Sequence, residues 1–359
     1  MSGKKIEELD ENFRRPPVGQ DANTLQWISA TDCRLTVRGL PWFEENGEVF
    51  SRLPLRAQGV VPPAVWQLAQ APASARLVFK TDATRLSLRM ENHSHANMPH
   101  FAVTGSDGAF LYEGGPNQMK PCCAIKPDIG QVRVEMDIAN TMPPMMHEYT
   151  IYLPLYAPLK SIEIGIPQGA TVAPPSPHRL AKPVVFYGTS ITQGGCASTA
   201  GGDFVSAIGR RLNLDVVNLG FSGNGKGEPE LARFISEIDA SAFVLDYCAN
   251  SGADGLRQTL PGFVAILRNQ HPHTPILLVS KIHYYRESRV DSEQMRDVMI
   301  CFYAAARTGG DENIHFVDGW SLLKKSEDMT LVDGVHPTSH GFALMADRLA
   351  PQLAYVLNL

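Results

Sequence analysis

The chain has 359 residues, of which 19% are charged and 44% hydrophobic, and its formal net charge is −5. This balance is typical of a globular protein, and the length allows two domains with separate cores. The negative charge argues against nucleic acid or an anionic membrane as the main partner. The polar residues 1–15 do not resemble a signal peptide, and no apolar run is long enough to cross a bilayer. We therefore expect a cytoplasmic protein that does not act at a membrane.

The cysteines and histidines give no convincing metal motif. The six cysteines form no C-x-x-C pair, which predicts reduced and mostly buried thiols. His93, His95 and His100 lie close together in the sequence, and a His-x-His pair can bind metal in a β-barrel. No glutamate follows at a suitable interval, however, so we predict that the protein uses no metal.

The first half of the chain has the pattern of an all-β domain. Residues 1–20 read as a mobile polar arm. Over residues 21–172, short runs of alternating apolar and polar residues are separated by turn residues, which is typical of half-buried antiparallel strands. We predict a β-sandwich, similar to a jelly roll. Clear examples of such runs are residues 76–80, 85–90, 131–136 and 148–153.

The pattern changes after a proline-rich stretch at residues 173–182, which we interpret as a stiff linker. From residue 183 to 359, apolar strand-like runs alternate with helical patterns such as Phe204/Ile208/Leu212. Repeated βα units predict a parallel sheet with helices on both faces, and hence a three-layer α/β/α domain of flavodoxin-like topology. The predicted strands lie near residues 184–187, 215–219, 243–247, 275–280 and 314–318.

Ser190 is the strongest candidate nucleophile. It follows the predicted buried strand that ends at Gly188, and in open α/β sheets ligands bind at this carboxyl edge. A serine there has an exposed hydroxyl and helix-start amides close by. The alternative is that Thr189 and Ser190 only cap the next helix.

The stretch from Gly220 to Gly227 follows the second predicted strand and has two interpretations. Gly220, four residues and then Gly225-Lys226 imitate a phosphate-binding loop, but Gly227 stands where serine or threonine should hold magnesium. The second interpretation is a loop that presents backbone N–H groups to a developing oxyanion.

Two later segments complete the candidate chemistry. Asn250 falls just beyond the third predicted strand, where its amide could reach the same edge, although asparagine in such a sequence is often only a turn former. Asp333 precedes His336 by three residues, so its carboxylate could fix the imidazole tautomer and leave Nε2 free as a base. A surface pair that only caps a helix is the alternative.

Together these segments resemble the SGNH (GDSL-type) hydrolase superfamily. The matching residues are Gly188-Thr189-Ser190, Gly223, Asn250 and the Asp-x-x-His-Pro run from Asp333 to Pro337, although Thr189 replaces the usual Asp and Ser251 the Asp that often follows Asn250. The resemblance implies an ester hydrolase without a cofactor. It also implies the triad Ser190, His336 and Asp333, with an oxyanion hole made by Ser190, Gly223 and Asn250.

The first half is similar to the β-domain of a bacterial two-domain subgroup of these hydrolases. That domain carries a Gly-x-Asp-Leu-Tyr element, which here is split between Gly105-Ser106-Asp107 and Leu111-Tyr112. The resemblance implies an esterase that acts on small acylated molecules such as acetylated sugars. We expect His283, Tyr284 and Tyr112 to bind substrate.

Two other functions remain open: a catalytically silent carbohydrate-binding protein that uses the β-domain, and a nucleotide-dependent enzyme that uses residues 220–226. The sequence also leaves open whether the chain forms a homo-oligomer.

Overall fold

The computed structural model describes residues 4, 6–14, 24–128 and 130–359. Of the predicted N-terminal arm, the described residues form a short helix and a 3-10 turn, α1 (Ile6–Leu9) and η1 (Glu11–Phe13); residues 1–3, 5 and 15–20 lie outside the described part. In that part no helix is both long and apolar enough to cross a membrane.

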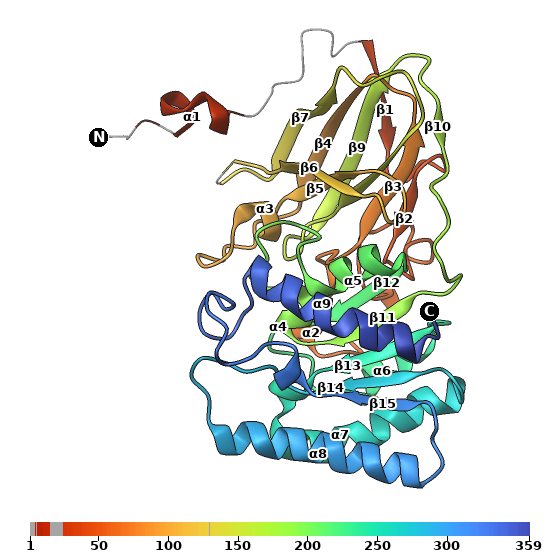
Figure 1. Cartoon of the computed structure of the whole chain (residues 1–359). Coiled ribbons are helices and arrows are strands. Elements are labelled where there is room, and N and C mark those ends of the chain that lie inside the picture. Colours follow the sequence, from red (N-terminus) through yellow and green to blue (C-terminus); the bar gives the residue numbers. More distant parts are fainter. Residues whose placement is uncertain (1–3, 5, 15–23, 129) are drawn as a thin grey trace.

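The first half of the chain forms two antiparallel sheets, which make up the upper body in Figure 1. One sheet has the strand order β1-β9-β4-β7, and the other has the order β10-β3-β8-β5-β6, with β2 paired to β3. The strands are β1 (Leu25–Ser29), β2 (Thr36–Arg38), β3 (Arg76–Thr81), β4 (Arg85–Asn92), β5 (Ala109–Glu113), β6 (Lys120–Ile125), β7 (Arg133–Asn140), β8 (His147–Tyr152), β9 (Leu159–Pro167) and β10 (Val172–Ala173).

Alternation along the strands produces the core between these sheets. In β4, Leu86 and Leu88 are fully buried and join side chains from both sheets in one hydrophobic cluster. Arg89 points to the other face and forms an ion pair with Glu135 on the neighbouring strand β7, at 2.7 Å.

The second half contains a parallel sheet with the strand order β12-β11-β13-β14-β15, which confirms the predicted flavodoxin-like arrangement. The strands are β11 (Val184–Gly188), β12 (Val216–Gly220), β13 (Ala242–Asp246), β14 (Ile276–Val279) and β15 (Ile314–Val317). The helices are α4 (Ser190–Gln193), α5 (Phe204–Leu212), α6 (Pro229–Ser236), α7 (Cys248–Gln270), α8 (Arg289–Thr308) and α9 (Ser339–Val356), with the 3-10 turn η4 (Gly319–Ser321).

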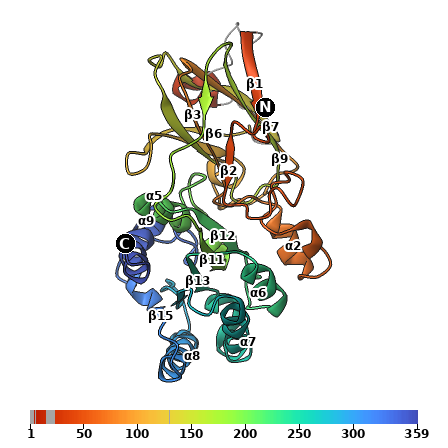
Figure 2. The same ribbon diagram turned by 90° about the vertical axis from the view of Figure 1, so that its right-hand side faces the viewer.

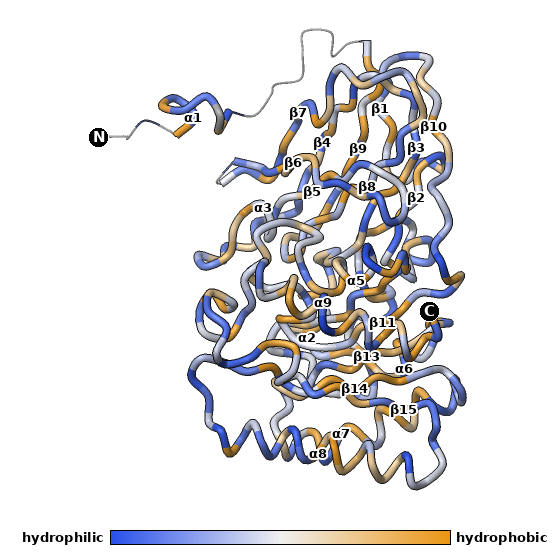
Figure 3. Tube along the Cα trace, in the orientation of Figure 1, coloured by the Kyte–Doolittle hydropathy of each residue, from blue (hydrophilic) through white to orange (hydrophobic). Residues whose placement is uncertain are grey.

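Strand β11 is buried on both faces, as the unbroken apolar run predicts. Val184 and Phe186 pack in the cluster that includes α5 and α9, whereas Val185 and Tyr187 pack in the cluster that includes α6, α7 and α8. Figure 3 shows the same concentration of hydrophobic residues along neighbouring strands of this sheet.

One segment from the first half of the chain packs against the second domain. Residues 40–73 contain η3 (Leu55–Ala57), α2 (Pro63–Ala69) and the smaller turns between them, and the strand-and-turn pattern does not predict these helices. Trp42, Leu53 and Val65 are buried in the same cluster as the side chains of α6 and α7, and Figure 2 shows α2 beside α6. The remaining helix of this half is α3 (Val103–Ser106).

The proline-rich stretch is fixed to both halves. Its first residue, Ala173, belongs to β10. Ser176 donates through its backbone N–H and its hydroxyl to Glu148 of β8, at 2.9 and 2.7 Å. His178 lies 3.2 Å from the side-chain oxygen of Asn213 and 3.3 Å from Arg76. The domain boundary at 173–182 stays a prediction. Residues 40–73 precede it in the sequence but pack against the second domain.

Candidate active site

The turn after β11 places Ser190 at the edge of the sheet. Thr189 caps α4: its hydroxyl accepts from the Ile191 N–H, and its own N–H donates to Thr192 Oγ1, each at 3.2 Å. Ser190 is then the first residue of the helix and is 8% exposed. Its N–H takes part in no hydrogen bond with another described residue, so it is free to bind a ligand.

Ser190, His336 and Asp333 form a hydrogen-bonded chain. The Ser190 hydroxyl lies 2.9 Å from His336 Nε2, and His336 Nδ1 lies 2.7 Å from Asp333 Oδ2. Because an ionised carboxylate can only accept, Nδ1 carries the ring proton and Nε2 faces the serine as an acceptor. This arrangement can activate the hydroxyl as a nucleophile.

The loop ahead of α9 fixes the carboxylate of Asp333. Its second oxygen accepts from the backbone N–H groups of Val335 and His336, at 3.0 and 2.8 Å. Burial alone would raise the pKa of Asp333, but these bonds and the His336 side chain lower that pKa to about 2. The carboxyl group is therefore ionised at neutral pH and can stabilise a positive charge on His336.

The loop after β12 packs directly onto the nucleophile turn. The Phe221 N–H donates to the Gly188 carbonyl at 3.0 Å. A Cβ atom at Gly225 would lie 2.0 Å from that same carbonyl oxygen, so only glycine permits this approach. Gly223 at the tip has a φ of 67° and open space around its Cα. Its N–H makes no hydrogen bond within the described chain, and can therefore point to a ligand.

Asn250 lies beside this loop. It falls in the first turn of α7, ahead of a break in the helix at Gly252, where φ is 65° and ψ is 175°. Its side-chain Nδ2 donates to the Phe221 carbonyl at 3.4 Å, which holds the amide toward the loop that carries Gly223. The structure thus brings Asn250 and the Gly223 loop to the edge where Ser190 lies. The loop offers no support for the phosphate-binding alternative, because the Gly227 N–H is already bonded to the Tyr187 hydroxyl at 2.8 Å.

Three residues of the β-domain lie around this edge, and of these the sequence pattern singles out only His100, in the histidine cluster. The Tyr156 hydroxyl, on the connection between β8 and β9, lies 3.4 Å from the Ser190 carbonyl oxygen. The Phe101 ring packs edge-on against Tyr156, with centroids 5.3 Å apart. The ring of His100 lies 6.1 Å from that of His336. No motif marks Tyr156 or Phe101, because their position depends on how the two domains dock.

All three predicted substrate-binding residues make contacts within the protein, and Lys281 Nζ lies 3.7 Å from the centroid of the Tyr284 ring. Tyr112 lies in the interface between the domains, where the Arg210 guanidinium covers its ring at 4.5 Å. His283 stacks on Trp320 and bonds to Glu287 at 3.0 Å. Tyr284 packs among the residues around α9 and β11. Burial raises its pKa, with a smaller contribution from nearby acids that include Asp333.

His93, His95 and His100 do not together form a set of side chains that could hold a metal ion in the described part of the chain. His95 pairs with Asp107 instead, with Nδ1 3.3 Å from Oδ1. One other set of three residues there could hold a metal ion, namely His100, Cys196 and His336.

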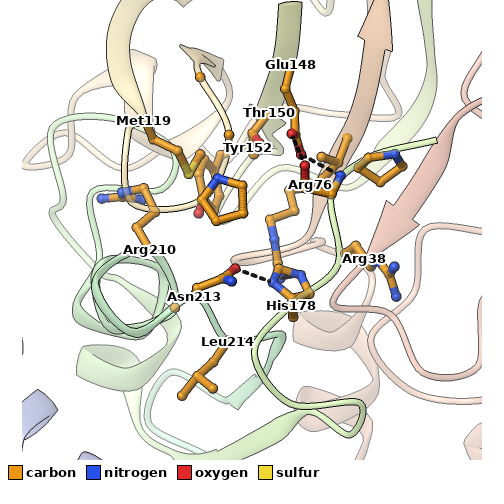
Figure 4. A pocket seen from close by; sticks show the side chains of 17 residues that line it. Arg38, Arg76, Met119, Glu148, Thr150, Tyr152, His178, Arg210, Asn213 and Leu214 are labelled. Atoms are coloured by element: carbon orange, nitrogen blue, oxygen red, sulfur yellow. Dashed lines mark hydrogen bonds between the residues drawn. The ribbon is translucent and has the colours of Figure 1, made fainter. Parts of the chain in front are cut away.

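The cavity shown in Figure 4 lies away from this chemistry. It has a volume of about 40 Å³ and lies between the β-domain, the linker and the C-terminal end of α5. That end of α5 leads into β12 at the amino edge of the sheet, whereas Ser190 follows the carboxyl edge. Arg76, which lines this cavity, already forms an ion pair with Asp215 at 2.7 Å.

The fold and this hydrogen-bonded chain are typical of serine hydrolases. Comparison with known families then gives a narrower assignment. The GDSL-like lipase/acylhydrolase family matches residues 181–354, and the N-terminal domain of esterases of the SGNH hydrolase type, named GxDLY, matches residues 25–172. The chain belongs to the SGNH/GDSL-type hydrolases and is an ester hydrolase. No curated protein matches the chain significantly.

Solved structures have the same two-domain architecture. A protein from Bacteroides ovatus ATCC 8483, described as a GDSL-like lipase, is 27% identical, with a TM-score of 0.84 over 93% of this chain and 98% of that one. The salicylyl-acyltransferase SsfX3 of a tetracycline biosynthetic pathway is 22% identical, with a TM-score of 0.74 over 93% and 98%. A family two carbohydrate esterase from Clostridium thermocellum, in complex with cellohexaose, is 12% identical, with a TM-score of 0.59 over 80% and 93%.

The family that matches residues 25–172 is named GxDLY, after the element Gly-x-Asp-Leu-Tyr. The split between Gly105-Ser106-Asp107 and Leu111-Tyr112 stays a prediction. The run Gly108-Ala109-Phe110-Leu111-Tyr112 also resembles the element, without a gap and with Phe110 in place of the Asp. Gly108 is required by packing, because a Cβ atom there would lie 2.6 Å from the Ile125 carbonyl oxygen.

Proposed function

We propose that the chain is a serine esterase that removes short acyl groups, with acetyl preferred, from a small alcohol or a carbohydrate ester. The observation that carries the proposal is the 2.9 Å contact between Ser190 Oγ and His336 Nε2, with Asp333 bonded to the other ring nitrogen at 2.7 Å. A nucleophile, its base and the group that orients the base are thus in reach of one another.

In the first half of the reaction, His336 Nε2 takes the Ser190 proton as Oγ attacks the ester carbonyl carbon. The negative charge that forms on the carbonyl oxygen is held by the N–H groups of Ser190 and Gly223 and by the Asn250 amide. When the tetrahedral intermediate collapses, the bond to the alcohol breaks, and His336 returns the proton to the departing oxygen. An acyl-enzyme and a free alcohol result.

In the second half, His336 takes a proton from water, whose oxygen attacks the acyl-enzyme. Collapse breaks the bond to Ser190 Oγ and releases the carboxylic acid, while His336 returns the proton to the serine. The proposed chemistry uses only groups that the chain provides, and no cofactor takes part.

The crowding around Ser190 supports a short acyl group. A Cβ atom at Gly195 would lie 3.0 Å from the Tyr156 hydroxyl and 3.3 Å from the His336 ring, which leaves little free space on that side of the nucleophile. Phe101 closes the same side behind Tyr156. A two-carbon acyl group needs the least room there.

A sugar-type alcohol is supported by two independent points. The fold is shared with carbohydrate esterases, one of them in complex with cellohexaose. The β-domain also adds Tyr156 to the surroundings of Ser190, which extends the site beyond the hydrolase domain. We assign Tyr284 as a contact for the alcohol part, because it lies at the carboxyl edge of β14 near Asp333. The intact triad argues against a catalytically silent carbohydrate-binding protein.

The test compares acyl length and alcohol size in one purified preparation. We expect kcat/KM to fall steadily from p-nitrophenyl acetate to the butyrate and octanoate esters. Phe101→Leu should weaken the preference for acetate over butyrate, because it opens the side that we assign to the acyl group. Tyr284→Phe should change kcat/KM for an acetylated cello-oligosaccharide more than for p-nitrophenyl acetate. Tyr303→Phe, on helix α8, is the matched control. Equal losses on both substrates would contradict the assignment of Tyr284 to the alcohol side, and a preference for octanoate would contradict the acetyl assignment.

A further inference from the structure

Three side chains with metal-binding atoms converge at the mouth of the site. One ring nitrogen each of His100 and His336 and the Cys196 sulfur all lie within 4.8 Å of one another. They come from three places: the β-domain ahead of α3, the loop after α4 and the loop ahead of α9. His100 is exposed, His336 half-buried and Cys196 only 5% exposed. A solvent ion can therefore approach from the His100 side.

The kinds of atoms indicate which ion would bind. A thiolate and two imidazoles are the donors that Zn²⁺ prefers, with bonds of about 2.0–2.3 Å in a tetrahedral site, whereas Mg²⁺ and Ca²⁺ prefer oxygen. A fourth position would remain open to water. All three separations lie within 4.8 Å, so any inward movement that bonding to one ion requires is small. His100 can make this movement, since it makes no hydrogen bond with any other described residue.

The triad already provides the outer partner of such a site. Zinc-bound histidines usually donate their second ring N–H to a carboxylate, which fixes the ring and raises its basicity as a ligand. His336 has this arrangement, with Nδ1 2.7 Å from Asp333 Oδ2. Its Nε2, which faces Ser190 at 2.9 Å, is the atom left to bind an ion.

We propose that His100, Cys196 and His336 form an inhibitory Zn²⁺ site, an inference that rests on the proposed role of His336 as the catalytic base. When Zn²⁺ binds, the Cys196 thiol loses its proton to solvent, and His336 Nε2 donates its lone pair to the metal. That nitrogen can then no longer accept the Ser190 proton, so acylation stops until the ion is removed. Burial, together with the charge of Asp333, raises the pKa of the Cys196 thiol to about 11; the thiol is therefore neutral when no ion is bound.

The first test is Zn²⁺ inhibition of p-nitrophenyl acetate hydrolysis by the full chain. We expect loss of at least nine-tenths of the activity at saturating Zn²⁺, recovery on addition of EDTA, and no effect of Mg²⁺ at the same concentration. Cys196→Ser and His100→Gln should keep the basal activity and raise the inhibition constant for Zn²⁺. Loss of an outer partner of a metal ligand lowers metal affinity by up to about 100-fold, so we expect loss of a direct ligand to raise the inhibition constant by at least that factor. Cys301→Ser and His93→Gln, an exposed cysteine and an exposed histidine outside the cluster, are the controls. Unchanged inhibition in both cluster variants would overturn the proposal.

The second test does not depend on activity. Co²⁺ added to the inactive Ser190→Ala variant should give a thiolate-to-metal charge-transfer absorption band, which should be absent in the double variant Ser190→Ala/Cys196→Ser. If the wild type hydrolyses no ester, the proposed function fails, whereas the cobalt band still tests the site. If the wild type is active and the band is absent, or survives loss of Cys196, the metal site is refuted.

Discussion

The Tyr156 hydroxyl lies 3.4 Å from the carbonyl oxygen of Ser190, so a residue from the β-domain contacts the candidate nucleophile turn directly. The Gln193 side chain makes a second connection: its Nε2 donates to the Leu155 carbonyl at 3.2 Å, and its Oε1 accepts from the Ser222 N–H at 3.0 Å. The nucleophile turn, the loop of Gly223 and the β-domain therefore form one hydrogen-bonded unit. Changes in any of the three should affect the position of the reacting atoms.

Ser190→Ala should abolish ester hydrolysis and leave the fold intact. Loss of a triad nucleophile lowers kcat by about a million-fold, because no other group can form the acyl-enzyme. The measurement is the initial rate with p-nitrophenyl acetate, together with the circular dichroism spectrum. Ser198→Ala is the matched control, since Ser198 is exposed and bonds through its backbone groups. Near wild-type turnover by Ser190→Ala would remove Ser190 from the mechanism.

Asn250→Ala should lower kcat by roughly 10²–10³-fold with a smaller effect on KM, because an oxyanion donor acts mainly in the transition state. Steady-state kinetics on one small ester measure both constants. Asn269→Ala, at the exposed far end of the same helix, is the control. A higher KM with unchanged kcat would instead make Asn250 a residue that binds the ground state of the substrate.

Much of the active-site edge could be predicted from the sequence. A buried strand ending in Gly188 fixes where Ser190 emerges, and the three-residue spacing of Asp333 and His336 keeps their contact local, so both predictions need little tertiary information. Each end of the five predicted strands of the parallel sheet also lies within one residue of the observed end, which is inside the usual uncertainty at element ends.

The contacts between the domains could not be predicted in the same way. Tyr156 meets Ser190, and Tyr112 meets Arg210, only because the two halves of the chain pack against each other in one orientation. Neither contact has a periodicity or spacing that a single sequence reveals. The packing of residues 40–73 could not be predicted for the same reason. Their short helices fall within the sequence range of the β-domain, but their apolar side chains are buried against α6 and α7 of the second domain.

We expect the stability of the Asp246→Asn variant to fall less with rising pH than the stability of the wild type. Burial raises the pKa of Asp246 to about 7 from its ordinary value of 3.8, although the Thr192 hydroxyl donates to it at 3.0 Å. Between these two pH values the folded state binds more protons than the unfolded state, so the stability that this group provides falls as the pH rises. Asparagine does not ionise and can still accept from Thr192.

The measurement is the melting temperature at pH 5 and at pH 8. We expect the fall between these two pH values to be smaller in Asp246→Asn than in the wild type. Asp239→Asn, an exposed aspartate paired with Lys182, should behave like the wild type. An identical pH dependence in Asp246→Asn would show that Asp246 does not retain its proton in the folded protein.

Arg52→Met should destabilise the whole chain. The buried guanidinium donates to four backbone carbonyls, those of Leu68, Ala71, Asn218 and Gly220. Hydrogen bonds with a charged donor contribute about 1.5–3 kcal/mol each, so we expect the free energy of unfolding to fall by at least about 4 kcal/mol. Urea denaturation measures the change. Arg34→Met, which removes a surface ion pair with Asp32 at 2.7 Å, should leave the free energy of unfolding close to the wild-type value, because exposed ion pairs contribute little.

Residues 40–73 determine which hybrids between this protein and its relatives can fold. Trp42, Leu53 and Val65 complete the hydrophobic layer on one face of the parallel sheet, and Arg52 holds the carbonyls at the end of β12. A chimera joined at the proline-rich linker would replace residues 40–73 together with the two antiparallel sheets. The foreign residues 40–73 would then pack poorly against α6 and α7 of the second domain. A graft that replaces only the two antiparallel sheets and keeps the host's own residues 40–73 should give an active hybrid. The part of the chain that must be transferred together to keep activity is therefore discontinuous in sequence: it consists of residues 40–73 and the second half of the chain.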